Sequence, residues 1–275
     1  MAASPFDHVM DAGRFEFFET FRWEYRLPRI HLPLYGDFQI TKFMILELLA
    51  AIVVVAIFVP FARRAQSGAP PTGFWFNTFE SLLTFFRDRV AKPNLGEHDA
   101  DHYVPYIWSF FIFILFCNLF GMLPYCGSPT ASFTVTAVFA VAAFIFIHGS
   151  AISRMGIGGY LKSYVPHMHV PYHMGLFIIP MIVVIEALSQ GIKTFVLAVR
   201  LFANMFAGHT VLAVILLFIV MSHNTAFYLF WPITLASVLG VTALSLLELF
   251  VAFLQAYIFT FLMALFLGMT LHPQH

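Results

Sequence analysis

Apolar residues fall into five long runs along this chain, and short polar stretches separate them. A helix needs about 20 apolar residues to cross a hydrocarbon core about 30 Å thick. Three runs have this length and two are much longer, so each is predicted to be a transmembrane helix. The pattern therefore predicts an all-α polytopic membrane protein with five spans. These spans are residues 40–62, 105–124, 131–152, 175–221 and 226–271.

The last two runs, residues 175–221 and 226–271, are too long for simple spans. As straight helices rising 1.5 Å per residue, each would measure roughly 70 Å, more than twice the membrane thickness. Each run therefore either folds back within the membrane or tilts far beyond the usual average of about 20°. The hydrophobic pattern alone leaves both arrangements open.

An amphipathic segment lies between the first two spans. Its apolar residues recur at helical spacing, and polar or charged residues occupy the other side. Because residues 74–91 are too few to span comfortably and are strongly two-faced, they are predicted to form a helix lying in the membrane interface. The apolar side consists of Trp75, Phe79, Leu82, Leu83, Phe86 and Val90.

Residues 1–39 differ from the remainder of the chain. They mix arginines with acidic residues and contain no apolar stretch of signal-peptide length, so no cleavable leader is expected. They are predicted to form an extramembrane arm with short amphipathic turns, broken at Pro28 and Pro33. Residues 40–275 are predicted to form a single membrane domain.

The composition supports a membrane protein and excludes a nucleic-acid partner. Of the 275 residues, 60% are hydrophobic and 10% are charged, and 35 are phenylalanine. The 14 basic and 14 acidic residues cancel, so the chain has no basic field for nucleic acid. This composition is typical of a protein whose surface contacts membrane lipid.

Neither the cysteines nor the histidines indicate a metal or cofactor site. Two cysteines, Cys117 and Cys126, are too few for a disulfide framework or a zinc site. His167, His169 and His173 resemble a soft-metal cluster, but their spacing is loose and prolines interrupt any helix face. A polar loop is the favoured interpretation, and no metal or cofactor is predicted.

The distribution of basic residues predicts the orientation. The short connections 125–130 and 222–225 carry no lysine or arginine. By the positive-inside rule, the two basic connections are cytoplasmic. The amino terminus is then outside and the carboxyl terminus cytoplasmic, although four arginines in the arm argue against this placement. The basic residues are Arg63, Arg64, Arg87, Arg89 and Lys92 in one connection and Arg154 and Lys162 in the other.

Ionisable and strongly polar residues are rare in the two long runs. Arg200 is the most informative, because a guanidinium does not lose its proton in a protein and so stays charged. A charged residue at membrane depth is by default a functional one. The full set is Glu186, Lys193, Arg200, Asn204, His209, Glu248 and Gln255.

The spacing on the fourth run separates these residues into two groups. Glu186, Lys193 and Arg200 follow one another at intervals of seven residues, so they share one slowly drifting helix face. Asn204, four residues beyond Arg200, stays near this face. His209, nine residues beyond Arg200, lies about half a turn around the helix.

The fifth run supplies a matching pair. Glu248 and Gln255 are seven residues apart and share a face. If the two long helices are antiparallel and Arg200 lies opposite Gln255, then His209 and Glu248 fall together on the outward side. A histidine and a carboxylate so placed can hold and pass a proton. Glu186 falls on the cytoplasmic side of Arg200.

This arrangement predicts a route for protons. Two aqueous half-channels that do not meet would admit protons from one side and release them to the other, provided that a mobile carboxylate carries them past Arg200. The arginine stabilises an ionised carboxylate and disfavours direct proton hopping. Because the chain offers no second set of mobile carboxylates, the carrier is expected to belong to a partner.

The segment from Lys193 to His209, followed by Glu248 and the run Leu254–Thr260, resembles subunit a of the F-type ATP synthase. The stretches Phe86–Glu97 and Cys117–Pro124 are similar to bacterial members of that family. The resemblance implies a non-catalytic subunit of the bacterial inner membrane that works against a ring of c subunits and is held by peripheral-stalk b subunits. It also implies that the last two helices are steeply tilted.

The resemblance further implies a role for each polar residue. Arg200 would face the essential carboxylate of the c ring, with Asn204 and Gln255 beside it. Glu186 would belong to the cytoplasmic half-channel, and His209 with Glu248 to the outward one. Many bacterial members carry Glu at the position of His209 and His at that of Glu248, so this chain has the pair exchanged.

Other interpretations of these residues remain open. An ion pair between Arg200 and Glu186 is disfavoured, because fourteen residues span about 21 Å along one helix. Lys193 either reaches an interface, pairs locally or takes part in the proton route. Asn204 is also suited to a hydrogen bond between helices.

Two other protein classes are alternatives. A self-contained secondary transporter would require a substrate site at discontinuous helices, and the sequence shows no inverted repeat to support one. A scaffold subunit without a conducting role would leave the buried charges unexplained. Copurification with a small ring-forming hydrophobic subunit distinguishes the first prediction from both.

Overall fold

The computed structural model describes residues 14–17, 23–26, 29–32, 36–39, 41–66, 73–123, 128–163, 172–222 and 227–272. Its contacts divide the chain into two compact units. The first comprises residues 1–64, 112–136 and 201–256, and the second comprises residues 65–111, 137–200 and 257–275. Cys126, His167 and His169, which entered the sequence predictions, lie outside the described residues.

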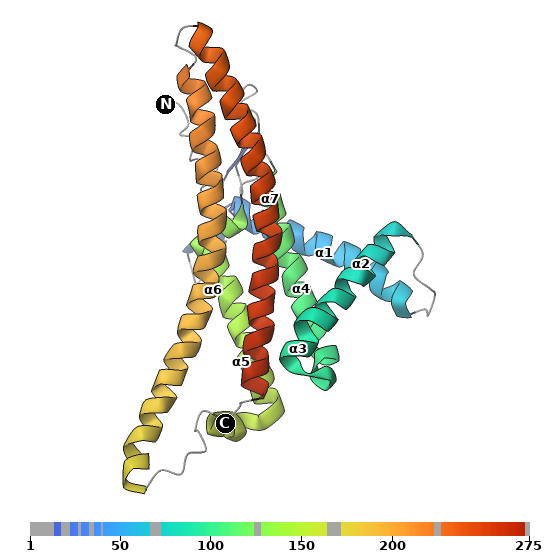
Figure 1. The fold of residues 1–275 in the computed structure, drawn as a ribbon, viewed down its shortest axis with the longest axis vertical. Helices are drawn as coiled ribbons and strands as arrows, with labels where there is room; N and C mark the ends of the chain where they lie inside the picture. Colours follow the sequence, from blue (N-terminus) through green and yellow to red (C-terminus); the bar gives the residue numbers. More distant parts are fainter. Residues whose placement is uncertain are drawn as a thin grey trace. The chain divides into compact units, whose positions relative to one another are not determined.

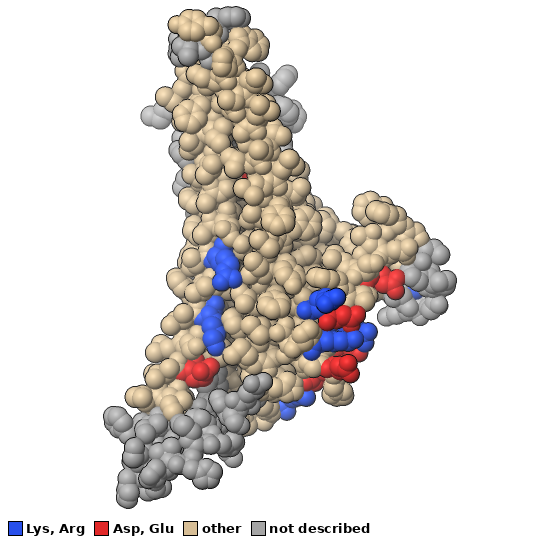
Figure 2. All heavy atoms as spheres, viewed as in Figure 1, with Lys and Arg blue, Asp and Glu red and all other residues tan. Residues whose placement is uncertain are grey.

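Five helices in the described part of the chain are long and apolar enough to cross a membrane (Figure 1). This confirms the predicted all-α membrane protein with five spans. Large apolar side chains are exposed along these helices, and most of the face drawn in Figure 2 is uncharged. The five are α1 (Lys42–Gln66), α4 (Glu97–Gly121), α5 (Phe133–Ser163), α6 (Tyr172–Ser222) and α7 (Phe227–Leu271).

The two long runs form continuous helices. Helix α6 contains 51 residues and α7 contains 45, and neither folds back. The fold-back alternative is therefore wrong. At 1.5 Å per residue, helices of this length exceed the thickness of a membrane by a wide margin, so strong tilting is the remaining way to accommodate them.

Helices α4 and α5 extend furthest beyond their predicted ends, and α1 and α6 do so by a few residues. Helix α4 begins at Glu97, not at Pro105, which lies inside the helix. Glu97 and Asp99 occupy its first turn, where acidic side chains interact favourably with the helix dipole. Helix α5 continues past residue 152 to Ser163, but Gly156 interrupts its helical geometry with φ 71° and ψ 163°. A backbone of this kind favours glycine.

The amphipathic segment is helical, as predicted, but not uniform. Helix α2 (Phe74–Phe85) passes into a π-helical turn, η1 (Phe86–Ala91), and then into α3 (Lys92–Leu95). In the second unit, Phe86 is buried against the ring of Phe111, at 4.4 Å between centroids. Outside the spans, a hydrogen bond from Lys92 lowers the pKa of the Asp88 carboxyl.

The described parts of the arm contain strands instead of the predicted amphipathic turns. Strand β1 (Arg14–Phe17) pairs antiparallel with β2 (Trp23–Arg26), and β3 (Arg29–Leu32) pairs antiparallel with β4 (Gly36–Gln39). Charged and aromatic residues alternate along β1 and β2, and a period of two is typical of strands. The division into an arm and a single membrane domain stays a prediction.

A buried hydrogen-bond network joins three elements of the first unit. Asn118 of α4 donates from Nδ2 to the carbonyl of Ala252 on α7, at 3.1 Å. Thr130, in the short 3-10 helix η2 (Pro129–Ala131), donates to Asn118 Oδ1 at 2.7 Å. A Cβ at Gly121 would lie 2.4 Å from Ser128 Cβ, so only glycine permits this close approach.

In the second unit, Asp99 connects three elements. Its carboxylate binds the guanidinium of Arg154 on α5, and Oδ2 lies 2.9 Å from Nε2 of His272 at the end of α7. Nearby, Arg87 of η1 donates two hydrogen bonds to Asp101 on α4, at 2.5 and 2.8 Å. These contacts hold α4 to its neighbours where the helix begins.

Candidate functional site

Helix α6 carries Glu186, Lys193 and Arg200 within the second unit, at the predicted intervals on one continuous helix. Oε1 of Glu186 accepts a hydrogen bond from Nε2 of Gln190 at 2.9 Å. Within this unit, no described residue forms an ion pair or hydrogen bond with the side chain of Arg200. The local ion pair between Arg200 and Glu186 is therefore absent. The N–H donors of the guanidinium are not used by described residues of this unit.

Lys193 has an aromatic neighbour. Its Nζ lies 5.6 Å from the centroid of the Phe266 ring on α7, inside the range of a cation–π contact. This contact supports the interpretation of Lys193 as a locally paired residue. Participation of Lys193 in a proton route stays a prediction.

His209 and Glu248 meet in the first unit, one on α6 and the other on α7. Nδ1 of His209 lies 3.2 Å from Oε1 of Glu248, and only 13% and 6% of the two side chains are exposed. The antiparallel register predicted this proximity from the sequence. Nε2 of His209 and Oε1 of Glu248 are both buried without a hydrogen-bond partner among the described residues.

Gly208 lies directly beside the carboxylate of Glu248. A Cβ at Gly208 would lie 2.8 Å from Oε1 of Glu248, closer than side-chain carbons approach other atoms. The carboxylate therefore occupies space that any larger residue at position 208 would take. Sequence reasoning missed Gly208, although its place directly before His209 was a signal.

The chemistry of the pair follows from its burial. A buried carboxylate without a partner is costly when ionised, and a buried imidazolium is equally so. One proton shared between two such groups would give either a neutral pair or an ion pair. His209 and Glu248 therefore lie close enough to share one proton.

Gln255 and Asn204 are the remaining predicted residues. Gln255 is buried on α7, and Asn204 is half-buried on α6. In the first unit, the described residues form no hydrogen bond with the side chain of Asn204. The predicted pairing of Arg200 with Gln255, and the roles of all seven residues, stay predictions.

Comparisons with known proteins point to one family. The family model described as ATP synthase A chain matches residues 44–268. The chain is 40% identical to ATP synthase subunit a 2 of Chlorobaculum tepidum over 268 residues, which cover 95% of this chain and 71% of that protein. It is 36% identical to ATP synthase subunit a of Myxococcus xanthus, over 87% of this chain and 75% of the relative. It is 37% identical to ATP synthase subunit a of Chloroherpeton thalassium, over 98% of this chain and 77% of that relative.

Proposed function

Because this chain belongs to the ATP synthase subunit a family, we propose that it is the stator subunit through which protons reach and leave a ring of c subunits. Two offset half-channels lead to and from the carboxylates of the ring, and Arg200 separates them. The buried contact between His209 and Glu248, at 3.2 Å, is the observation that carries this proposal. Family membership disfavours the alternative of a self-contained secondary transporter.

Arg200 acts as a fixed electrostatic barrier. Its permanent charge stabilises an ionised ring carboxylate that passes it, and repels a proton that would cross directly. No described acid of its own unit neutralises this charge. Each proton that crosses releases about 2.3 kcal/mol per 100 mV of membrane potential, and the barrier forces this energy through the rotating ring.

His209 and Glu248 supply the outward half-channel. A proton from the outside resides on this pair, transfers to a ring carboxylate and neutralises it, so that the carboxylate leaves the arginine and enters the lipid. Asn204, four residues beyond Arg200 on α6, and Gln255 on α7 orient the carboxylate by hydrogen bonding.

Glu186 supplies the inward half-channel. Its hydrogen bond from Gln190 holds the carboxylate on α6, where it receives the proton that the returning ring carboxylate gives up. Lys193, next along the face, balances this negative charge and is itself held by Phe266. The chain makes and breaks no covalent bond other than those to protons.

The surroundings follow from the same proposal. The chain lies in the bacterial inner membrane with its amino terminus outside and its carboxyl terminus in the cytoplasm. Its partners are the c ring, the b subunits of the peripheral stalk and membrane lipid. ATP itself is made elsewhere in the complex.

Replacement of Arg200 tests the proposal. Inverted membrane vesicles containing Arg200→Ala should assemble the complex but lose ATP-driven proton pumping, measured by quenching of a pH-sensitive dye. Arg89→Ala removes a basic residue outside the proposed route and should pump normally. Normal pumping by Arg200→Ala would defeat the proposal.

A further inference from the structure

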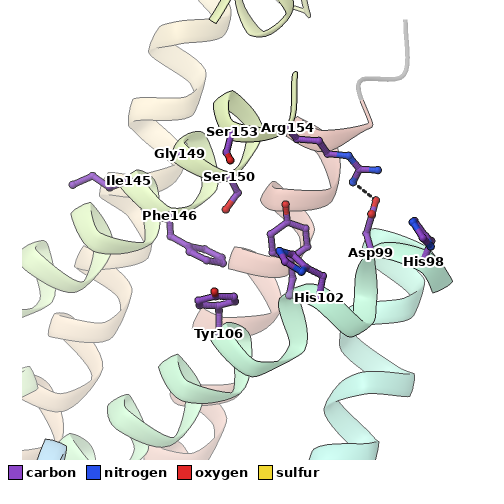
Figure 3. A pocket seen from close by; sticks show the side chains of 11 residues that line it. His98, Asp99, His102, Tyr106, Ile145, Phe146, Gly149, Ser150, Ser153 and Arg154 are labelled. Atoms are coloured by element: carbon purple, nitrogen blue, oxygen red, sulfur yellow. Dashed lines mark hydrogen bonds and ion pairs between the residues drawn. The ribbon is translucent and has the colours of Figure 1, made fainter. Parts of the chain in front are cut away.

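A cavity of about 660 Å³ lies in the second unit between α4 and α5 (Figure 3). Helix α4 lines it with His98 and His102, and α5 lines it with Ser150, Ser153 and Arg154. None of these residues belongs to the proposed proton route. The cavity lies beside the polar first turns of α4 and beside Arg154 of α5. We expect such polar segments next to apolar spans at the level of lipid head groups.

Hydrogen-bond donors dominate the polar side of this cavity. Arg154, two imidazoles and two serine hydroxyls surround it, as the close view shows (Figure 3). The single carboxylate of the lining, Asp99, already accepts from Arg154 and from His272. Arg154 has five N–H donors and its side chain is 39% exposed, so its contact with Asp99 leaves donors available. Such a lining suits the oxygens of a phosphate group.

An apolar stripe leads away from the cavity along α5. Ile145, Val141 and Val138 are 64%, 52% and 60% exposed, and their spacing places them on one helix face. At the cavity end, the ring of Phe146 packs against that of Tyr106, with centroids 5.2 Å apart. A free phosphate ion would leave the stripe uncovered, whereas the acyl chain of an amphiphile would cover it.

We propose that this cavity binds the phosphate of a phospholipid head group, with an acyl chain along the stripe of Ile145, Val141 and Val138. Arg154 and the serine hydroxyls hold the phosphate oxygens, and His98 and His102 close the site from α4. The recognised chemistry is that of a phosphate oxyanion, and the stripe assigns its source to lipid.

Photocrosslinking tests this site in the intact complex. The complex is reconstituted in phosphatidylcholine vesicles that contain a small fraction of phosphatidylglycerol carrying a diazirine on its acyl chain, and crosslinked residues are mapped by mass spectrometry. Labels are expected on α5 near Ile145. Arg154→Gln should reduce labelling about tenfold, the order of effect of one charge-assisted hydrogen bond.

A second variant fills the cavity without touching the ion pair of Arg154. A Cβ at Gly149 meets no atom within 4 Å, so Gly149→Leu extends into the open space and should also reduce labelling about tenfold. Gly158→Leu is the matched control, because a Cβ there also meets nothing within 4 Å and Gly158 does not line the cavity. It should label like the unsubstituted chain.

Four results would overturn the proposal. Undiminished labelling of an assembled Gly149→Leu complex would show that lipid does not enter the cavity. Equal labelling by a diazirine diacylglycerol, which lacks phosphate, would show that the head group is not recognised. Loss of labelling in the presence of millimolar inorganic phosphate would assign the site to the free anion. Release of another subunit by Gly149→Leu would assign the cavity to a protein partner.

Discussion

Replacing Gly208 with alanine should disturb the His209–Glu248 pair while leaving both residues in place. The new Cβ would lie 2.8 Å from Oε1 of Glu248, and ordinary van der Waals contact begins at 3.4 Å. The carboxylate must therefore move by about 0.6 Å, which alters its 3.2 Å contact with Nδ1 of His209.

The size of the effect follows from the interaction that is lost. Breaking a buried ion pair costs roughly 3 to 5 kcal/mol, so partial loss of this contact should cost at least about 1.4 kcal/mol, which corresponds to a factor of ten. Proton entry through the outward half-channel should therefore slow by about tenfold or more. Helix propensity works in the opposite direction, because alanine favours a helix over glycine by about 1 kcal/mol, so the variant should still fold.

Passive proton flux in vesicles stripped of the ATP-making part of the complex measures this entry step. Gly240→Ala is the matched control, since it makes the same exchange in the facing helix of the first unit, where the Cβ would lie 3.9 Å from Ile215. The amount of chain in the membrane is compared by immunoblot. Equal flux through the two variants at equal amounts would refute the argument that the position of the Glu248 carboxylate limits proton entry.

Three further changes test other contacts. Glu248→Gln should slow proton entry in the same flux assay more than Asn204→Ala does, and the reverse ranking would count against the outward half-channel. Asn118→Ala should lower the free energy of unfolding by about 1 to 3 kcal/mol, because it removes the donor to the buried Ala252 carbonyl; an unchanged melting temperature of the solubilised complex would contradict this. Asp99→Asn should likewise lower the melting temperature, since it weakens the contacts with two basic side chains, and no shift would show that these contacts contribute nothing measurable.

Periodicity carried much of the sequence prediction. Runs of apolar residues identified all five spans, because a membrane core requires a minimum length of apolar helix. The contact between His209 and Glu248 was also predictable, since regular helices convert residue spacing into position. Because each long helix contains few polar residues, only a few alignments of one helix with the other bring these residues together.

Features that depend on tertiary contacts escaped prediction. Asn118 and Ala252 are 134 residues apart, and no local pattern links them. The early start of α4 was missed because Pro105 is a usual helix boundary, whereas here the chain continues the helix through it. In the arm, the alternation of charged and aromatic residues was a strand signal that the interpretation as amphipathic turns did not use.

The contacts of Asp99 with Arg154 and His272 have a consequence for biosynthesis. The carboxylate of Asp99 leaves the ribosome 173 residues before His272, and the second of its basic partners is therefore available only late in translation. Until His272 is made, only Arg154 of these two partners is available to Asp99, and the contact of His272 with α4 is missing. A nascent chain that stops short of His272 would therefore lack this last connection between α7 and α4.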